Sequence, residues 1–320
     1  MQGRALLNQA STRALSGRTV VNCVSRRTVR AMASSSGRDQ SPDGLRNAGP
    51  EAKRFTVADG QLGNVASAAL PFLLRFGSGG FASGYSSGLK ADDGTYGVVK
   101  AAGRTVAETS KVGTFKRPAK TLELYEFMSC PFCRKVREAI SILDLDVMVY
   151  PCPKDGVTWR PKAVELGGKA QFPFLVDPNT GRQLYESDDI IAYLFNEYGD
   201  GQVPLALRMG LFTTLTCGLA MAPRAGKGGR YVASKVPSKP VTLWAYEASP
   251  FVVVVKEALS ELEIPYLQVT CSRGSPKRQQ LLEKRGTFQV PYLEDPNQGV
   301  YLFESSAIVK YLYDTYAVKA

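Results

Sequence analysis

The sequence predicts an α/β fold made of two copies of a β-α-β-α-β-β-α unit in tandem. Residues 122–127 alternate apolar and polar side chains, which is typical of a strand. Apolar residues at helical spacing follow from Val136 to Leu143. The same order of elements recurs 118 or 119 residues later, and a repeat at a fixed offset indicates duplication of one structural unit.

The remaining elements of the first unit follow in order along the chain. A second strand is expected over residues 146–152, and a polar helix over residues 159–166. Residues 171–179 are typical of a strand that ends in a turn, and residues 182–185 complete a hairpin. The apolar residues that follow share one helical face, so we expect a last helix with Ser187 as its N-cap.

Two cysteines lie where the first strand turns into the first helix. Cys130 and Cys133 form a C-x-x-C motif, and Pro131 suits a first helical position because it has no N–H to leave unpaired. Lowering a thiol pKa from ~8.5 to ~6 needs roughly 3 kcal/mol, whereas a helix N-terminus supplies only ~0.3–1 kcal/mol. Other donors, including the Cys133 S–H, must supply the rest. The motif predicts Cys130 as nucleophile and Cys133 as resolving thiol.

Half of a zinc site and a pair of buried thiols are the alternative interpretations of these cysteines. A zinc site needs further cysteine or histidine ligands at suitable spacing. The chain has no histidine and no second C-x-x-C motif. Redox or glutathione chemistry is therefore favoured, and no metal site is predicted.

Three motifs together resemble a known family. They are Cys-Pro-Phe-Cys at 130–133, Phe-Pro at 172–173 and Glu-Ser-Asp at 186–188. In this order they are similar to a glutaredoxin or to the N-terminal domain of a soluble glutathione transferase. The resemblance covers residues 121–198 and 241–317, about half of the chain. It implies that both units are thioredoxin-like domains and that glutathione is the cofactor.

The resemblance also implies roles for individual residues. Pro173 is expected to be cis and to face the Cys130 thiol, and a cis X–Pro bond costs only ~0.5–1 kcal/mol. Glu186 and Ser187 are expected to bind the γ-glutamyl end of glutathione, because a helix start can receive a carboxylate. An edge-strand proline and a plain helix cap are the alternatives. The predicted glutathione-binding set is completed by Phe132 and Phe172.

The second unit departs from the motif at the thiols. Ser249 and Val252 replace the two cysteines, so this unit cannot exchange disulfides. Serine-type glutathione transferases carry a catalytic serine near this position, but they also use a helical C-terminal domain, and this sequence ends at Ala320. A binding or scaffolding role is favoured. Its equivalents of the glutathione-binding residues are Ser249, Pro291, Glu304 and Ser305.

A further thiol, Cys152, follows the second strand, and Cys271 is its counterpart in the second unit. The first two strands of this fold run parallel, so both end at the same edge of the sheet. We therefore expect Cys152 on the side of the active site, within reach of Cys130 or of bound glutathione. A small, partly buried residue is the alternative.

The first 38 residues hold seven arginines, no acidic residue and many serines and threonines. This composition predicts an organelle transit peptide over residues 1–36. Residues 29–31 resemble a stromal processing site, so the chloroplast stroma is favoured over a mitochondrion; a disordered basic tail is the alternative. Without these arginines the net charge falls from +11 to +4, so no nucleic-acid partner is expected.

The first unit is predicted over residues 121–200 and the second over residues 241–320. Residues 37–120 are rich in glycine and serine and are expected to form a partly ordered extension, with a small helix over residues 98–112. The linker at 201–240 is predicted to contain a helix.

The linker helix raises the question of a membrane. Its apolar run over residues 204–222 nearly reaches the ~20 residues that span a bilayer. Arg208 and several polar residues favour instead a helix that bridges the two units. Residues 201–246 hold six Lys or Arg and no acidic residue, so membrane association is considered but not favoured.

These observations predict a glutathione-dependent thiol–disulfide oxidoreductase of the chloroplast. Glutathione is the predicted partner, and protein disulfides are a second class of substrate. Two alternatives stay open. One is a glutathione transferase or isomerase, and the other is a non-catalytic glutathione-binding scaffold, assembly factor or iron–sulfur carrier.

Overall fold

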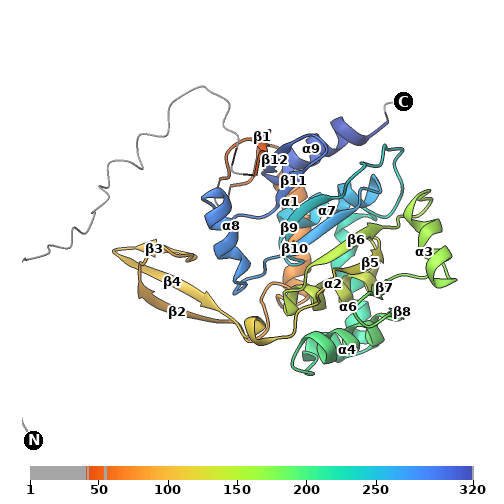
Figure 1. Ribbon diagram of the computed structural model, residues 1–320, viewed down its shortest axis with the longest axis horizontal. Helices are drawn as coiled ribbons and strands as arrows, with labels where there is room; N and C mark the ends of the chain where they lie inside the picture. Colours follow the sequence, from red (N-terminus) through yellow and green to blue (C-terminus); the bar gives the residue numbers. More distant parts are fainter. Residues whose placement is uncertain (1–40, 42, 54–55, 319–320) are drawn as a thin grey trace, which may run out of the picture. The chain divides into compact units, whose positions relative to one another are not determined.

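The computed structural model describes residues 41, 43–53 and 56–318 of the chain. The predicted transit peptide over residues 1–36 lies outside the described residues. Strands and helices alternate along most of the described chain (Figure 1). The elements that precede the first unit are β1 (Arg46–Asn47), α1 (Leu62–Leu74), β2 (Ser86–Ala91), β3 (Lys100–Ala101), β4 (Arg104–Thr109) and η1 (Val112–Thr114).

Both units show the predicted order of elements, so the predicted fold class is confirmed. Their helices and strands recur at the offset of 118 or 119 residues found in the sequence. The first unit consists of β5 (Leu122–Glu126), α2 (Pro131–Leu143), β6 (Val147–Pro151), α3 (Trp159–Gly167), β7 (Phe174–Asp177), β8 (Arg182–Leu184) and α4 (Ser187–Tyr198). The second consists of β9 (Val241–Ala245), α7 (Pro250–Glu261), β10 (Tyr266–Thr270), α8 (Lys277–Arg285), β11 (Tyr292–Asp295), β12 (Val300–Phe303) and α9 (Ser305–Tyr316).

A single sheet joins the two units. Among the described residues it has nine strands, in the order β1-β12-β11-β9-β10-β6-β5-β7-β8. The join is the antiparallel pair β6–β10, in which Met148 lies opposite Leu267. These two residues are 119 positions apart and are therefore equivalent in the repeat. A local pseudo-two-fold axis thus passes between them.

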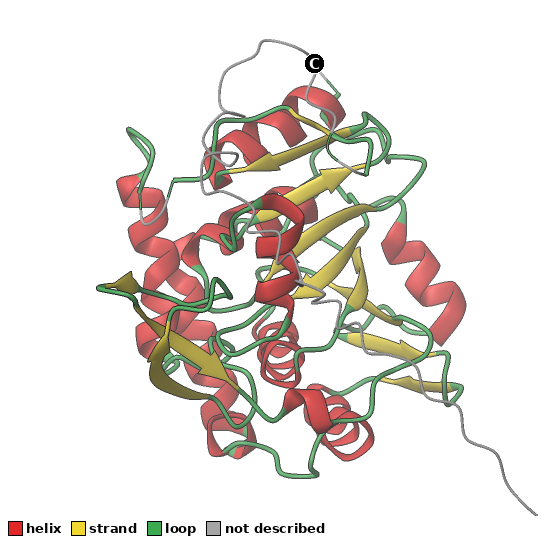
Figure 2. Ribbon diagram, turned by 60° about the vertical axis from the view of Figure 1, so that its left-hand side comes forward, coloured by secondary structure: helices red, strands yellow, loops and turns green. Residues whose placement is uncertain are grey.

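Helices cover both faces of this sheet (Figure 2). Apolar residues of α2, α4, α7 and α9 share one buried core, which is continuous across the two units. On the opposite face α3 and α8 pack in separate, smaller clusters. Successive side chains of a strand point to opposite faces of the sheet, which explains the separate cores. In β5, Leu124 lies in the shared core and Tyr125 in the cluster under α3.

The duplication extends beyond what the sequence analysis found. Each unit is preceded by an apolar helix, α1 or α6 (Leu211–Met221), and then by the sequence Arg-x-Gly-x-Gly-Gly, at residues 75–80 and 224–229. These segments are 149 residues apart, whereas the units are 119 apart. The difference is an insertion after the first segment, and this insertion contains β2, β3 and β4.

The two leading segments cross over, so each one braces the other unit. Helix α1 packs on α7 of the second unit, and α6 packs on α2 of the first. The backbone of Gly80 accepts a hydrogen bond from Arg273 N–H at 3.0 Å, and Gly229 accepts one from Lys154 N–H at 2.7 Å. The helices also bind each other: Arg75 Nη1 donates to Thr216 Oγ1 and Arg224 Nη1 to Ser67 Oγ, at 2.7 and 2.6 Å.

The extension is more regular than its composition indicates. The predicted helix over residues 98–112 is wrong, because this stretch forms β3, β4 and the start of η1. A turn at Ala102 and Gly103, both with positive φ, reverses the chain and pairs β3 with β4. Strand β4 also pairs with β2, and the resulting three-stranded sheet stands apart from the large one (Figure 1).

The linker contains the predicted helix in two pieces. The short α5 (Leu205–Arg208) ends before Gly210, whose φ of 54° interrupts the helix, and α6 follows, with η2 (Ala222–Arg224) after it. No helix of the described residues is long and apolar enough to cross a membrane. Helix α6 packs on α2 of the first unit and on α1, and α1 packs on α7 of the second unit, so the two helices together bridge the units.

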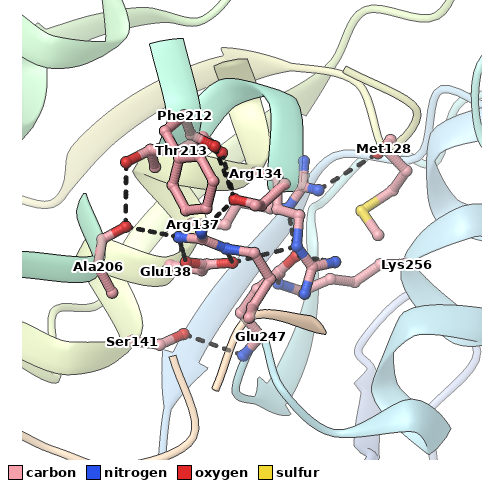
Figure 3. Close-up of polar contacts among 12 residues, drawn as sticks. Met128, Arg134, Arg137, Glu138, Ser141, Ala206, Phe212, Thr213, Glu247 and Lys256 are labelled. Atoms are coloured by element: carbon pink, nitrogen blue, oxygen red, sulfur yellow. Dashed lines mark hydrogen bonds and ion pairs between the residues drawn. The ribbon is translucent and has the colours of Figure 1, made fainter. Parts of the chain in front are cut away.

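A network of buried charges lies where the two units meet (Figure 3). Its centre is Glu247, which follows β9 of the second unit. Arg137 Nε of the first unit lies 3.0 Å from its Oε1, and Lys256 Nζ lies 3.2 Å from its Oε2. Arg134 Nη1 approaches Oε1 at 3.6 Å, and Arg137 also contacts Glu126. All these side chains are buried, so each depends on its partners to offset its lost hydration.

The charged neighbours decide the ionisation of Glu247. Burial disfavours the carboxylate, but Arg137, Lys256 and Arg134 outweigh burial and lower its pKa to about 2. The Glu247 carboxylate therefore stabilises the fold at pH values above its unfolded pKa of about 4.3. This stabilisation is lost as the pH falls through the folded pKa.

Removing the negative charge of Glu247 is expected to weaken the whole fold. Glu247→Gln leaves three buried cations with one carboxylate fewer, and the expected loss in free energy of unfolding is about 3–5 kcal/mol at neutral pH. Urea unfolding followed by circular dichroism measures this. The difference in free energy of unfolding between Glu247→Gln and the unmutated chain should become smaller as the pH falls toward 2.

Glu51→Gln is the matched control, because it makes the same chemical change at an exposed residue. It is expected to alter stability by less than about 0.5 kcal/mol. Equal stability of the two variants would show that the buried network contributes nothing net to the fold.

Candidate thiol site

Cys130 occupies the N-cap position of α2, with an extended backbone conformation, and Pro131 is the first helical residue. The Cys133 N–H donates to Cys130 Sγ at 3.2 Å, so the thiol takes the place of a capping oxygen. Cys130 Sγ also lies 3.9 Å from the Phe172 carbonyl oxygen, which it can reach as a weak donor. Both cysteines are free thiols, and Cys130 is buried but for 5% of its surface.

The two thiols differ in acidity. The Cys133 thiol hydrogen-bonds to Cys130, and this bond, with the Cys133 N–H and the charge of Arg137, lowers the pKa of Cys130 against the effect of burial. Burial and the neighbouring Cys130 raise the pKa of Cys133 well above its usual range. Cys130 is thus the more acidic thiol of the pair, and Cys133 donates a hydrogen bond to it.

Aromatic side chains and one arginine surround the thiols. Phe132 is 46% exposed, so its ring is available beside Cys130. The Phe172–Pro173 peptide bond is cis, as the resemblance implied. Arg160 on α3 lies over the Phe172 ring at 4.8 Å and over the Phe127 ring at 6.0 Å.

The start of α4 forms the second part of the site. Glu186, and not Ser187, is the N-cap residue, because its φ of 56° lies in the left-handed region and the helix begins one residue later. The predicted N-cap was therefore wrong by one position. The Glu186 carboxylate is exposed and accepts a hydrogen bond from Gln171 Nε2 at 2.5 Å. Ser187 is buried, and its N–H belongs to the free donors of the first helical turn.

Cys152 is placed beneath the site. It is completely buried beside Tyr125, Ala163 and Phe174, and its thiol donates to the Tyr150 carbonyl oxygen at 3.4 Å. Burial raises the pKa of this thiol well above its usual range. In this position Cys152 packs the floor of the site, and its use as an extra thiol would need the aromatic cluster to open.

The second unit has a cavity where the first has its thiols. Its volume is about 260 Å³, and Ser249, Pro291, Glu304 and Ser305 all line it, so the structure brings the four predicted equivalents together. Val290–Pro291 is cis and Glu304 has a φ of 66°, as at the first site. The N-terminal extension supplies part of the wall through Lys53, Thr56 and Val98.

Sequence reasoning missed the arginines on α3 and α8. Arg160 and Arg278 are 118 residues apart, and both lie over an aromatic ring of their site. Arg278 lies over Tyr246 at 5.4 Å and donates to Tyr96 of the extension at 3.0 Å. The repeat itself was the signal that could have found them, since a charged residue kept at equivalent positions of both copies points to a shared task.

Two regions of the chain, residues 124–202 and 243–320, match the family model of the glutathione S-transferase N-terminal domain. They coincide with the two units described above. The chain thus carries two glutathione S-transferase N-terminal domains in tandem. The first domain has the two cysteines at its helix start, and the second has Ser249 and Val252 there.

Individual relatives match the chain over shorter lengths. The glutathione S-transferase-like protein OpS6 of Beauveria bassiana is 31% identical over 78 residues, which is 24% of this chain and 36% of that protein. A solved Bombyx mori glutathione transferase, BmGSTD1, is 28% identical, with a TM-score of 0.24 over 26% of this chain and 38% of its own. The structure of BmGSTD1 in complex with GTT is 24% identical, with a TM-score of 0.25 over 35% of this chain and 49% of its own.

Alkylation should distinguish the two thiols of the first domain. Cys130 is expected to react with iodoacetamide at a lower pH than an ordinary thiol does. The reason is that only the thiolate reacts, and the pKa of Cys130 is lowered. Cys133→Ala removes the hydrogen-bond donor that contributes most to the lowered pKa of Cys130. The pH at which Cys130 reaches half of its maximal alkylation rate should therefore rise. Peptide mass spectrometry of samples quenched at different pH values measures both rates.

Cys217→Ala controls for the loss of a buried thiol elsewhere, since this residue lies on α6. It should leave the pH profile of Cys130 unchanged. A profile that is equally unaffected by Cys133→Ala would disprove the donor role of Cys133.

Proposed function

We propose that the first domain is a glutathione-dependent thiol–disulfide oxidoreductase. The observation that supports this most is the pairing of two free cysteines at one helix start, with the pKa of Cys130 lowered and that of Cys133 raised. A second support is the family, because the glutathione S-transferase N-terminal domain model includes this site.

The proposed reaction begins with the Cys130 thiolate. It attacks one sulfur of a disulfide, forms a mixed disulfide with it and releases the other sulfur as a thiolate. Cys133 then loses its proton and attacks Cys130 Sγ, which releases the second thiol and leaves a Cys130–Cys133 disulfide. Formation of the mixed disulfide removes the negative charge that raised the pKa of Cys133, so the second attack becomes easier. Two glutathione molecules reduce the domain again and become glutathione disulfide.

Glutathione would lie between the two helix starts. We propose that its γ-glutamyl carboxylate accepts hydrogen bonds from the free N–H groups at Ser187. Its ammonium group would form an ion pair with the exposed Glu186 carboxylate. The cis Pro173 peptide and the Phe132 ring would border its cysteine, next to Cys130. Arg160, held over Phe172, would face its second carboxylate.

Glutathione-dependent reduction of a small mixed disulfide tests this function. Cys130→Ser is expected to abolish the activity, because no other described thiol has a lowered pKa and the nucleophile is lost. Cys133→Ser should keep part of it, since glutathione can resolve the mixed disulfide instead. Steady-state rates measured with glutathione reductase and NADPH show both effects.

Glu186→Gln and Asp189→Asn form a matched pair for glutathione binding in the same assay. Both change an exposed carboxylate at the start of α4 to an amide, but only Glu186 is placed at the site. Glu186→Gln should raise KM for glutathione about ten-fold with kcat retained. The proposed oxidoreductase function would be refuted if the unmutated chain bound glutathione but did not reduce disulfides. Conjugation of glutathione to an electrophile by the same chain would then favour a transferase.

We further propose that residues 1–36 direct the chain to the chloroplast. The support is the composition of this stretch, which is rich in arginine and lacks acidic residues. Import of the radiolabelled chain into isolated chloroplasts should yield a shortened, protease-protected product. Import into mitochondria alone would contradict this location.

A further inference from the structure

The helices α1 and α6 have their large apolar side chains on the outside. In α1 the buried residues are Val65, Ala68 and Pro71, and in α6 they are Thr213, Cys217 and Ala220. These are small or polar. The exposed side chains are larger and more apolar, which reverses the usual orientation of an amphipathic helix on a soluble protein. They are Leu62, Leu70, Phe72, Leu73 and Leu74 of α1, and Leu211, Phe212, Leu215 and Leu219 of α6.

The two helices lie side by side, so their exposed residues form one surface, which we call the α1/α6 face. The mutual hydrogen bonds of Arg75 with Thr216 and of Arg224 with Ser67 show that the helices are adjacent and antiparallel. Exposure on this face is high, with Leu211 at 87% and Leu62 at 70%. Exposed leucine and phenylalanine side chains gathered on two adjacent helices mark an interaction surface.

Most charges around the α1/α6 face are cationic. Residues 62–91 and 201–246 contain no acidic residue, although exposed Asp59 comes three residues before α1. Exposed Arg208 precedes α6, and exposed Lys227 follows η2, so cations lie at both ends of the helix pair. Asp188 of α4 comes near α6, but it is paired with Lys135, which also contacts Thr214.

We propose that the α1/α6 face docks on the surface of a membrane that contains anionic phospholipids. The leucine and phenylalanine side chains would enter the boundary between headgroups and acyl chains, while Arg208 and Lys227 would meet the lipid phosphates. The helices lie in the surface and do not cross the bilayer, in accord with their length. This inference is independent of the chemistry proposed for Cys130.

Charge also distinguishes a lipid surface from the other possible occupants. A second copy of the chain, docked face to face, would bring a second set of cations to a surface whose two helices, α1 and α6, contain no acidic residue. Like charges without partners disfavour such a contact. Residues 1–38 are poor candidates for the same reason, because they hold seven arginines and no acidic residue.

Co-sedimentation with lipid vesicles tests the proposal on the full chain. The chain is expected to bind vesicles of phosphatidylcholine with phosphatidylglycerol more strongly than vesicles of phosphatidylcholine alone. The triple variant Leu211→Gln, Leu215→Gln, Leu219→Gln should lower the partition coefficient more than about ten-fold. Arg208→Gln and Lys227→Gln should each lower it about five-fold, and on the anionic vesicles only.

Matched controls separate the α1/α6 face from general effects. Leu89→Gln changes a residue of β2 that is 60% exposed, as Leu215 is, and Lys310→Gln removes an exposed cation of α9. Both should bind as the unmutated chain does. The arginines of residues 1–38 are present in every variant and therefore cancel from the comparison. Circular dichroism and Tm confirm that each variant is folded.

Two results would overturn the proposal. One is equal vesicle binding by the triple leucine variant and the unmutated chain. The other is a concentration-dependent dimer in sedimentation velocity that the triple variant loses, without any change in vesicle binding. That second result would assign the α1/α6 face to contact between copies of the chain.

Discussion

The buried carboxylate of Glu247 is the constraint on which the junction of the two domains depends. It belongs to the second domain, yet its closest cation is Arg137 on the helix that carries the cysteines of the first. Neither charge is hydrated, so each depends on its buried partners, which also include Glu126 for Arg137 and Lys256 for Glu247. The pair of Arg137 with Glu247 therefore ties the first domain to the second.

The charges at this junction also influence the thiols of the first domain. Arg137 is held by Glu126 and Glu247, and its positive charge contributes to the lowered pKa of Cys130. The second domain, which has no thiols of its own at this position, thereby helps to set the chemistry of the first. The second domain therefore has a structural task without thiols of its own at this position, because its Glu247 carboxylate positions a cation behind the cysteines of the first.

The two copies have also diverged in what surrounds their sites. In the first, aromatic rings and Arg160 lie close to a buried Cys130. In the second, Lys53 and Thr56 of the N-terminal extension, and Val98 between β2 and β3, line part of a cavity at Ser249. The extension, whose composition alone indicated little order, is thus structural material for the second domain. The same crossing of leading segments leaves α1 and α6 on the outside, with their leucines exposed.

Local patterns in the sequence determined the two units and the order of their elements, and they placed the start of α4 to within one residue. Period-two and helical spacings are set by neighbouring residues, so they can be read without the fold. The position of Cys130 follows from a motif of this kind, whereas the cis Pro173 and the grouping of Ser249 with Glu304 were implied by the family resemblance and the repeat. The strands at 100–109 were missed because a reversal at Ala102 and Gly103 is a matter of backbone conformation that composition does not reveal.

Tertiary structure alone decided the contacts between distant segments. The pairing of β6 with β10, the crossing of α1 and α6, and the burial of Arg137 against Glu247 join residues that are about 80 to 190 positions apart. Such contacts depend on which faces remain to be covered once the local elements have formed, and no local pattern records that. For the same reason the apolar residues of α6 could be recognised in the sequence as one helical face, whereas only the structure shows that this face points outward.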